Sequence, residues 1–299
     1  MRRSYGRDFW LSLRMAVALA VVALIYLAAE AIALILTAAA AGDGNIGAAL
    51  GGLLLAAGIV AGLIVQLRKP ETLLLRTARA KVLDGDEHPE LRALVARVAA
   101  QADLPEPRVA LIHSWAPNAL TAARKPETAV VAVTTELLRR LEPNQLEAVV
   151  AHELAHVANR DGPVMTFVGG PAMAMSAFWH AEDSRGKISY ILLFWITVPL
   201  HVISLLLMWT VSRYREYAAD RGSALITGAP QDLISALLAI EGGSPPRSDL
   251  RGGLAVNAFC IVSRRSRRRR VELVMDHPPV RKRIKRLEEL ARELGKAES

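Results

Sequence analysis

The chain has 299 residues, 52% of them hydrophobic, with a mean hydropathy of +0.26 and a formal net charge of +8. This composition is too apolar for an ordinary soluble enzyme. A single cysteine, Cys260, excludes an internal disulfide and a metal site built from several thiolates. The basic residues cluster beside apolar runs, so their placement is more informative than their sum.

The first two apolar runs predict a membrane hairpin. Residues 15–41 contain Glu30 as their one charged residue and residues 46–67 contain none, so each run can cross about 30 Å of hydrocarbon as a helix. A cleaved signal peptide is the alternative for the first run, because arginines precede it. Glu30 is costly at the middle of a bilayer and is expected to be functional or paired, although the sequence does not name its partner.

A second hairpin is predicted over residues 163–179 and 188–211. The earlier of these runs is short, and Gly169, Gly170 and Pro171 interrupt it, so a buried or re-entrant helix is the alternative there.

Positive charges flanking the runs predict the orientation. These residues are Arg2, Arg3, Arg7, Arg14, Arg68, Lys69, Arg213 and Arg215. Because cytoplasmic flanks carry an excess of Lys and Arg, residues 68–162 and 212–299 are both expected on the cytoplasmic side of the cell (inner) membrane.

The segment between the hairpins predicts a mixed α+β lobe. Residues 72–82 and 89–102 have helical periodicity, and a further helix starts at Pro143. Residues 108–113 and 128–134 are short, β-branched runs typical of strands. We expect 128–134 to be an edge strand that pairs with an extended substrate.

The predicted helix from Pro143 contains the pattern H-E-x-x-H, formed by His152, Glu153 and His156. Histidines four residues apart lie on one helical face, so both imidazoles can reach one zinc ion at about 2 Å. Glu153 lies beside them and is placed to take a proton from a water molecule. The alternative is a polar stretch of an ordinary helix, since so short a pattern also arises by chance.

A candidate third ligand follows the fourth apolar run. Glu216 and Asp220 are four residues apart and share a helical face. Glu216 completes a set of two histidines and one carboxylate, which leaves a fourth zinc position open, as in catalytic sites. Asp220 is suited to accept a hydrogen bond from the outer nitrogen of a ligand histidine. A solvated helix whose acidic residues pair with nearby arginines is the alternative.

Residues 117–120, 146–156, 159–161 and 215–220 together resemble the HtpX-type membrane metallopeptidases. These are bacterial heat-shock proteases related to the CAAX prenyl proteases. The order of two apolar runs, a zinc helix, two further runs and a Glu-x-x-x-Asp helix also matches, so the resemblance covers nearly the whole chain.

The resemblance implies a role for each matching residue. His152, His156 and Glu216 would bind Zn²⁺, Glu153 would be the general base and Asp220 would orient a ligand histidine. Asn118 matches an asparagine beside the substrate cleft, and Leu120 replaces the family's usual phenylalanine. His277 and Arg283 match a pair thought to stabilise the oxyanion, whereas a histidine before two prolines is by itself more typical of a turn or helix start.

We therefore expect a mainly α, polytopic membrane protein with about four transmembrane helices and a cytoplasmic α+β zincin-like catalytic lobe. Its expected parts are a transmembrane hairpin (1–67), the catalytic lobe (68–162), a second hairpin (163–211) and a C-terminal cytoplasmic part (212–299) with the third ligand.

The expected function is zinc-dependent endoproteolysis in quality control of misfolded membrane proteins, with protein or peptide substrates and the lipid bilayer as partners. A membrane scaffold or chaperone-like protein that keeps the zinc fold without catalysis is the alternative. Six arginines between residues 264 and 270 favour acidic lipid head groups or a solvated loop over nucleic acid, because no aromatic residues are interleaved.

Overall fold

The computed structural model describes residues 70–85, 87–162, 164, 190–241 and 278–297, together with isolated helical positions between residues 13 and 31. The chain divides into two compact units. The first comprises Met1–Gly6, Lys69–Pro163 and Ser212–Ser299, and the second comprises Arg7–Arg68 and Val164–Val211. All the site residues placed below belong to the first unit.

Several sequence predictions fall outside the described residues. They concern Glu30, His277, the arginines of 264–270, the run over 46–67, and most of the runs over 15–41 and 163–179. The predicted run over 188–211 is helical from Tyr190, where the long helix α8 (Tyr190–Thr227) begins. Within the described part of the chain, no helix has both the length and the apolar character that crossing a membrane requires.

A four-stranded sheet organises the first unit. Its order is β1 (Lys81–Val82), β2 (Arg108–Ile112), β4 (Val130–Thr134) and β3 (Ala119–Ala122). β2 and β4 are parallel, whereas β1 and β3 pair antiparallel with their neighbours. The short 3-10 helix η1 (Pro126–Thr128) precedes β4.

Both faces of the sheet are buried, which explains the nearly continuous apolar sequence of β2 and β4. Alternate residues of each strand point to opposite faces. Val109 and Val131 join the main core that also contains α6 residues, while Ala110 and Val130 join a smaller cluster with Leu75 of α3 (Pro70–Thr77).

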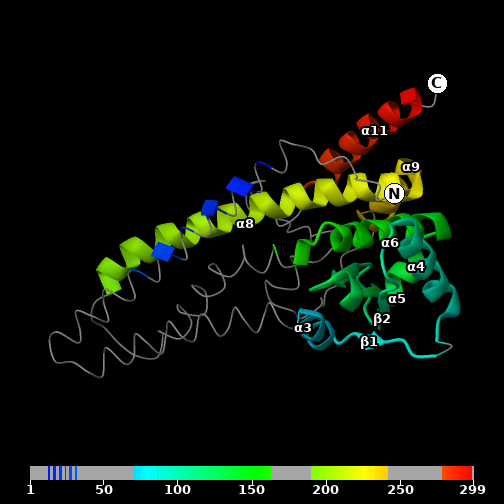
Figure 1. Cartoon of the computed structure of the whole chain (residues 1–299), viewed down its shortest axis with the longest axis horizontal. Coiled ribbons are helices and arrows are strands. Elements are labelled where there is room, and N and C mark those ends of the chain that lie inside the picture. Colours follow the sequence, from blue (N-terminus) through cyan, green and yellow to red (C-terminus); the bar gives the residue numbers. More distant parts are fainter. Residues whose placement is uncertain are drawn as a thin grey trace. The chain divides into compact units, whose positions relative to one another are not determined.

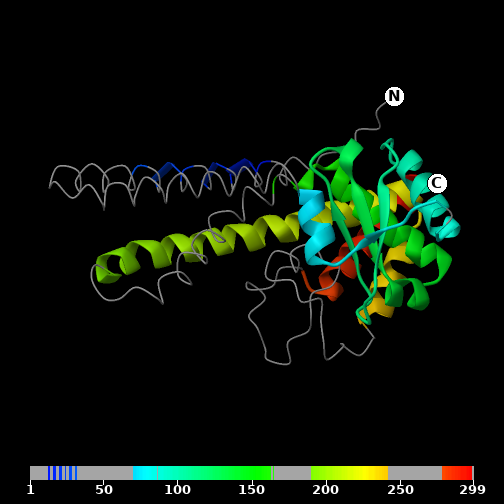
Figure 2. The same ribbon diagram turned by 90° about the horizontal axis from the view of Figure 1, so that it is seen from below.

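Helices cover the main face in further layers. They are α4 (Pro89–Gln101), α5 (Thr135–Arg140), α6 (Pro143–Ala158), α9 (Pro230–Glu241) and α11 (Val280–Ala297). α6 packs against β3 and β4 on one side and α9 on the other, and α11 packs on α9. Figure 1 shows this succession from the sheet through α6 and α9 to α11, and Figure 2 views it from the side of the sheet.

The structure corrects three details of the lobe. The predicted helix over 72–82 ends at Thr77, because Arg79 takes a left-handed φ of 51° and the chain then enters β1 beside β2. The prediction that 128–134 is an edge strand is wrong, because β4 lies between β2 and β3. The edge strands are β1 and β3, and β3 was not predicted because its four residues, Ala-Leu-Thr-Ala, carry no strong strand signal.

In the sequence, the helical spacing of Val280, Ile284, Leu287, Leu290 and Leu294 predicts a packing helix, which is confirmed as α11. Val280, Leu287 and Leu290 are buried in the main core, with Ile284 and Leu294 packed against it. The described fold is thus mainly helical with one small sheet.

Candidate metal centre

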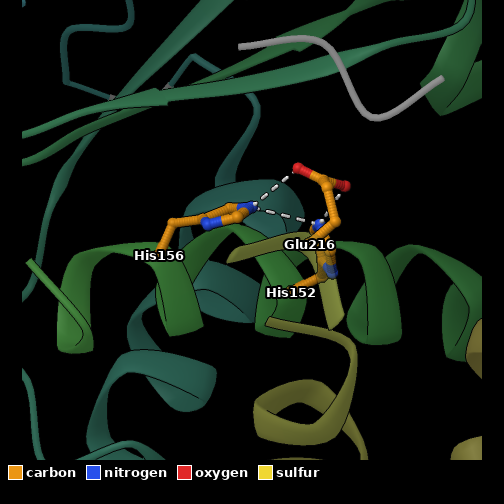
Figure 3. A group of neighbouring side chains, drawn as sticks. All are labelled: His152, His156 and Glu216. Carbon is orange, nitrogen blue, oxygen red and sulfur yellow. Dashed lines mark hydrogen bonds and ion pairs between the residues drawn. The ribbon is translucent and has the colours of Figure 1, made fainter. Parts of the chain in front are cut away.

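The H-E-x-x-H pattern lies in α6, one of the most deeply buried helices of the first unit. Pro143 occupies its first turn, where proline costs no hydrogen bond, and Glu142 and Gln145 form a capping box at its start. His152 is 1% exposed and Glu153 3% exposed. The two histidines project from successive turns of α6, and their ring nitrogens meet (Figure 3).

Two small residues let α8 come close to α6 and deliver the third candidate ligand. A Cβ atom at Gly222 of α8 would lie 2.6 Å from the Cβ atom of Ala155 in α6, so any larger residue would force the helices apart. The next residue, Ser223, donates a hydrogen bond of 2.7 Å from Oγ to the carbonyl of Ala148. This contact brings Glu216 to the two histidines although it follows His156 by 60 positions in the sequence.

The three candidate ligands converge on one point (Figure 3). The Nε2 atoms of His152 and His156 are 3.2 Å apart, and each lies 3.6 Å from one carboxylate oxygen of Glu216. Tetrahedral zinc with bonds of about 2.0–2.1 Å separates neighbouring ligand atoms by about 3.3–3.4 Å. The observed separations therefore fit one zinc-sized cation.

The outer nitrogen of His152 faces Asp220. Nδ1 lies 3.1 Å from Asp220 Oδ1, an ion-pair contact rather than a well-aligned hydrogen bond. Burial acts to lower the pKa of His152, but Asp220 and Glu216 outweigh it and raise the pKa to about 9.

Arg283 of α11 clamps both carboxylates of α8. Its Nε and Nη2 donate to the two oxygens of Asp220 at 2.9 and 2.6 Å, and its Nη1 lies 3.3 Å from Glu216 Oε2. Burial acts to raise the pKa of Asp220, yet Arg283 and His152 hold it below the ordinary value. Arg283 is 1% exposed. The structure thus places it behind the ligands, in contact with acidic side chains.

His156 has a corresponding pair of neighbours, Asp161 and Arg215. Its Nδ1 lies 2.6 Å from Asp161 Oδ2, and Arg215 Nε lies 3.1 Å from the same oxygen. In the sequence, Asp161 belongs to the stretch that carries the resemblance and Arg215 also counts among the flanking positive charges, but neither pattern predicts a contact with His156. An aspartate five positions after a ligand histidine was the available signal in the sequence. The left-handed turn at Arg160 determines that the carboxylate of this aspartate reaches His156.

The remaining predicted residues are placed as follows. Glu153 is buried; burial acts to lower the pKa of Arg283, but Asp220, Glu216 and, to the smallest extent, Glu153 raise it. Asn118 is 5% exposed and directly precedes β3; its N–H donates to Thr134 Oγ1, and its carbonyl accepts from the N–H of Thr134. Leu120 is fully buried in the smaller cluster.

The donor set itself fits a metal ion. If Nδ1 of each histidine is protonated toward its aspartate, both Nε2 lone pairs point at one spot, with the Glu216 carboxylate beside them. Such convergence of acceptors is unfavourable unless a cation occupies the point. Nitrogen and carboxylate ligands together suit zinc, although other first-row divalent metals accept the same ligands.

An H-E-x-x-H helix whose histidines meet a carboxylate from a second helix defines the centre of a metal-dependent peptidase class. The model for peptidase family M48 matches residues 86–291. The chain belongs to this family and is a protease.

Two relatives are similar over most of the chain. A protease HtpX homolog of Moorella thermoacetica is 38% identical over 98% of this chain and 99% of the relative. A protease HtpX homolog 2 of Methanosarcina acetivorans is 38% identical over 77% of this chain and 82% of the relative.

Among solved structures, the crystal structure of S. mikatae Ste24p overlaps 79% of this chain and 58% of its own, with 17% identity and a TM-score of 0.48. That overlap is too weak to establish a common fold.

Proposed function

We propose that this protease is a membrane-embedded, zinc-dependent endopeptidase that hydrolyses peptide bonds in misfolded membrane proteins. One observation carries the proposal: His152, His156 and Glu216 place their ligand atoms within 4.8 Å of one another in a chain of peptidase family M48. In this proposal the three residues hold the metal, and Glu153 is the catalytic base.

Each residue has a defined task in peptide hydrolysis. When bound, zinc acidifies a water molecule and polarises the scissile carbonyl. Glu153 accepts the proton of the attacking water and returns it to the leaving amine, which requires a carboxylate rather than an amide. Asp220 orients His152, and His277 and Arg283 are the residues that the resemblance assigns to the oxyanion.

Strand β3 is the element we propose for substrate binding. Within the described sheet it pairs with β4 on one side only, and it packs against α6. An extended peptide that adds to such an edge is held by main-chain hydrogen bonds, which depend little on side chains. Asn118, which directly precedes this strand, is the residue that the resemblance assigns to the substrate cleft. Recognition of this kind suits the removal of diverse misfolded chains.

The proposed membrane placement rests on the apolar runs and the flanking positive charges of the sequence. The catalytic unit would face the cytoplasm. Because Cys260 is the chain's one cysteine, a membrane-impermeant maleimide tests this placement directly. Labelling is expected in inverted inner-membrane vesicles and not in intact spheroplasts, with detergent-treated membranes as the control for reactivity. The reverse pattern would refute the orientation.

The decisive test of function is Glu153→Gln in purified protein. The amide keeps the shape of the side chain but cannot take a proton, so zinc content should be retained and casein cleavage should fall at least 100-fold. Glu147→Gln is the matched control on the same helix, where the native carboxylate pairs with Arg97 at 2.8 Å and is partly exposed. Undiminished cleavage by Glu153→Gln would remove this residue from the reaction.

Glu216→Ala tests the third ligand. The variant should lose zinc on dialysis while Glu147→Ala keeps one zinc per chain, and normal zinc content would rule out the assignment. A wild-type protein that binds zinc but cleaves neither casein nor unfolded membrane proteins would support the scaffold alternative.

A further inference from the structure

The turn that follows α6 is built to fold an acidic side chain back onto His156. α6 ends at Ala158, and Arg160 takes a left-handed φ of 56° while its N–H donates to the carbonyl of Val157. This reversal places the carboxylate of Asp161 2.6 Å from His156 Nδ1. A left-handed arginine is strained, so its presence needs an explanation.

The position of Asp161 is also fixed from its other side. A Cβ atom at Gly162 would lie 2.6 Å from the backbone oxygen of Ala123, just beyond β3. Only glycine permits this approach, because the obstructing atom is backbone and cannot rotate away. The turn is therefore held between α6 and the end of the substrate-side strand, with Asp161 2% exposed.

Arg215 completes the arrangement from α8. Its Nε lies 3.1 Å from the oxygen of Asp161 that faces His156, and its Nη2 lies 3.5 Å from His156 Nδ1. Arg215 is 4% exposed, so the pair is buried and each charge compensates the other. Arg215 directly precedes Glu216, and the pair thus joins the third-ligand helix to the turn after the histidine helix.

The distances indicate which ring nitrogen of His156 carries the proton. An arginine that donates to Nδ1 would require the proton on Nε2 and would turn the metal-facing nitrogen into a donor. A carboxylate that accepts from Nδ1 requires the opposite tautomer, with a free lone pair on Nε2. The contact of 2.6 Å to Asp161 is far shorter than the 3.5 Å to Arg215, so the metal-binding tautomer prevails.

We propose that Asp161 and Arg215 are positioning residues for the metal centre: Asp161 fixes the tautomer and ring orientation of His156, and Arg215 holds Asp161 in place. The proposal rests on the zinc site of the proposed function. It gives each ligand histidine its own buried aspartate and arginine, with Asp220 and Arg283 serving His152.

The test compares three variants by zinc affinity, measured by competition with a chromophoric chelator, and by thermal melting. Arg215→Met leaves Asp161 buried without a cation, and both stability and zinc affinity should fall. Asp161→Leu/Arg215→Met removes both charges at similar volume, so melting should recover. Its zinc affinity should remain about 10–100-fold below wild type, because Nδ1 has lost its acceptor.

Asp161→Asn/Arg215→Met is the conservative counterpart. The amide oxygen can still accept from Nδ1, so this neutral pair should bind zinc within about 10-fold of wild type and more tightly than the leucine pair. The visible absorption of the cobalt-substituted leucine pair should also differ from that of wild type, which reports a changed ligand field. Arg221→Met, an exposed arginine on the same helix, should change neither quantity.

The outcomes separate this inference from the proposed function. If both neutral pairs bind zinc as tightly as wild type once their melting temperatures recover, Asp161 and Arg215 have a merely structural role and the inference is overturned. If wild-type protein binds no zinc, the proposed function itself fails. Tight zinc binding by wild type and the asparagine pair, with weak binding by the leucine pair, supports the inference and the zinc site on which it rests, whereas casein cleavage tests the proposed function.

Discussion

Arg283→Met is the substitution for which the structure gives the clearest magnitude. The arginine neutralises Asp220 through two hydrogen bonds of 2.9 and 2.6 Å and also lies 3.3 Å from Glu216. Removing one partner of a buried ion pair costs about 3–5 kcal/mol, because a charge is left without compensation. With zinc bound, Glu216 stays neutralised and the loss should be near 3 kcal/mol. Without zinc, both carboxylates lose their compensating charge, and the loss in the free energy of unfolding should approach about 5 kcal/mol.

These values correspond to a melting temperature lower by on the order of 10 °C for a unit of this size. The assay is thermal unfolding of the detergent-purified chain at one fixed scan rate, with zinc and with chelator. Arg281→Met is the matched control, because Arg281 is exposed on the same helix two residues earlier. Asp220→Asn/Arg283→Met should recover part of the loss, since both charges are then absent.

One result would refute this reasoning. If Arg283→Met melted within about 2 °C of Arg281→Met while turnover collapsed, Arg283 would act on the substrate, as the resemblance to the HtpX-type enzymes implies. A large drop in melting temperature that Asp220→Asn/Arg283→Met partly reverses would instead show that Arg283 acts by joining α11 to the acidic side chains of α8.

Two further predictions concern packing and pH. Gly222→Ala should weaken zinc binding and lower the free energy of unfolding by about 1–3 kcal/mol, because its Cβ atom would lie 2.6 Å from that of Ala155. Gly295→Ala, where a Cβ atom meets open space, is the control and should be neutral or stabilising. Equal melting temperatures of the two variants would contradict this prediction. Arg139, as hydrogen-bond donor, is the largest cause that lowers the pKa of Glu136 from its ordinary 4.5. The contribution of this ion pair to stability is therefore complete above pH 4.5 and is lost as pH falls through the lowered pKa. Glu136→Gln should make the melting temperature fall less steeply at acid pH. An unchanged fall would exclude the Glu136–Arg139 pair as a cause of acid destabilisation.

Local sequence determined the elements of the site that depend on neighbouring residues. The spacing of His152 and His156 puts both imidazoles on one face of any helix that contains them, and the same holds for Glu216 and Asp220. The alternating and periodic apolar residues likewise predicted α4, β2, α6 and α11 closely. Such patterns are readable because helix and strand geometry act over a few residues.

Tertiary structure decided which of these pieces meet. The order of strands left β3 at one edge and β4 in the interior, although β4 follows β3 in the sequence. The positions of Arg283 and Asp161 depend on where α11 packs and how one turn reverses. In the sequence, charged side chains at these positions look like ordinary surface residues, and they gain partners only by being buried beside the ligands. Contacts between distant segments are fixed by the packing of the core rather than by local periodicity.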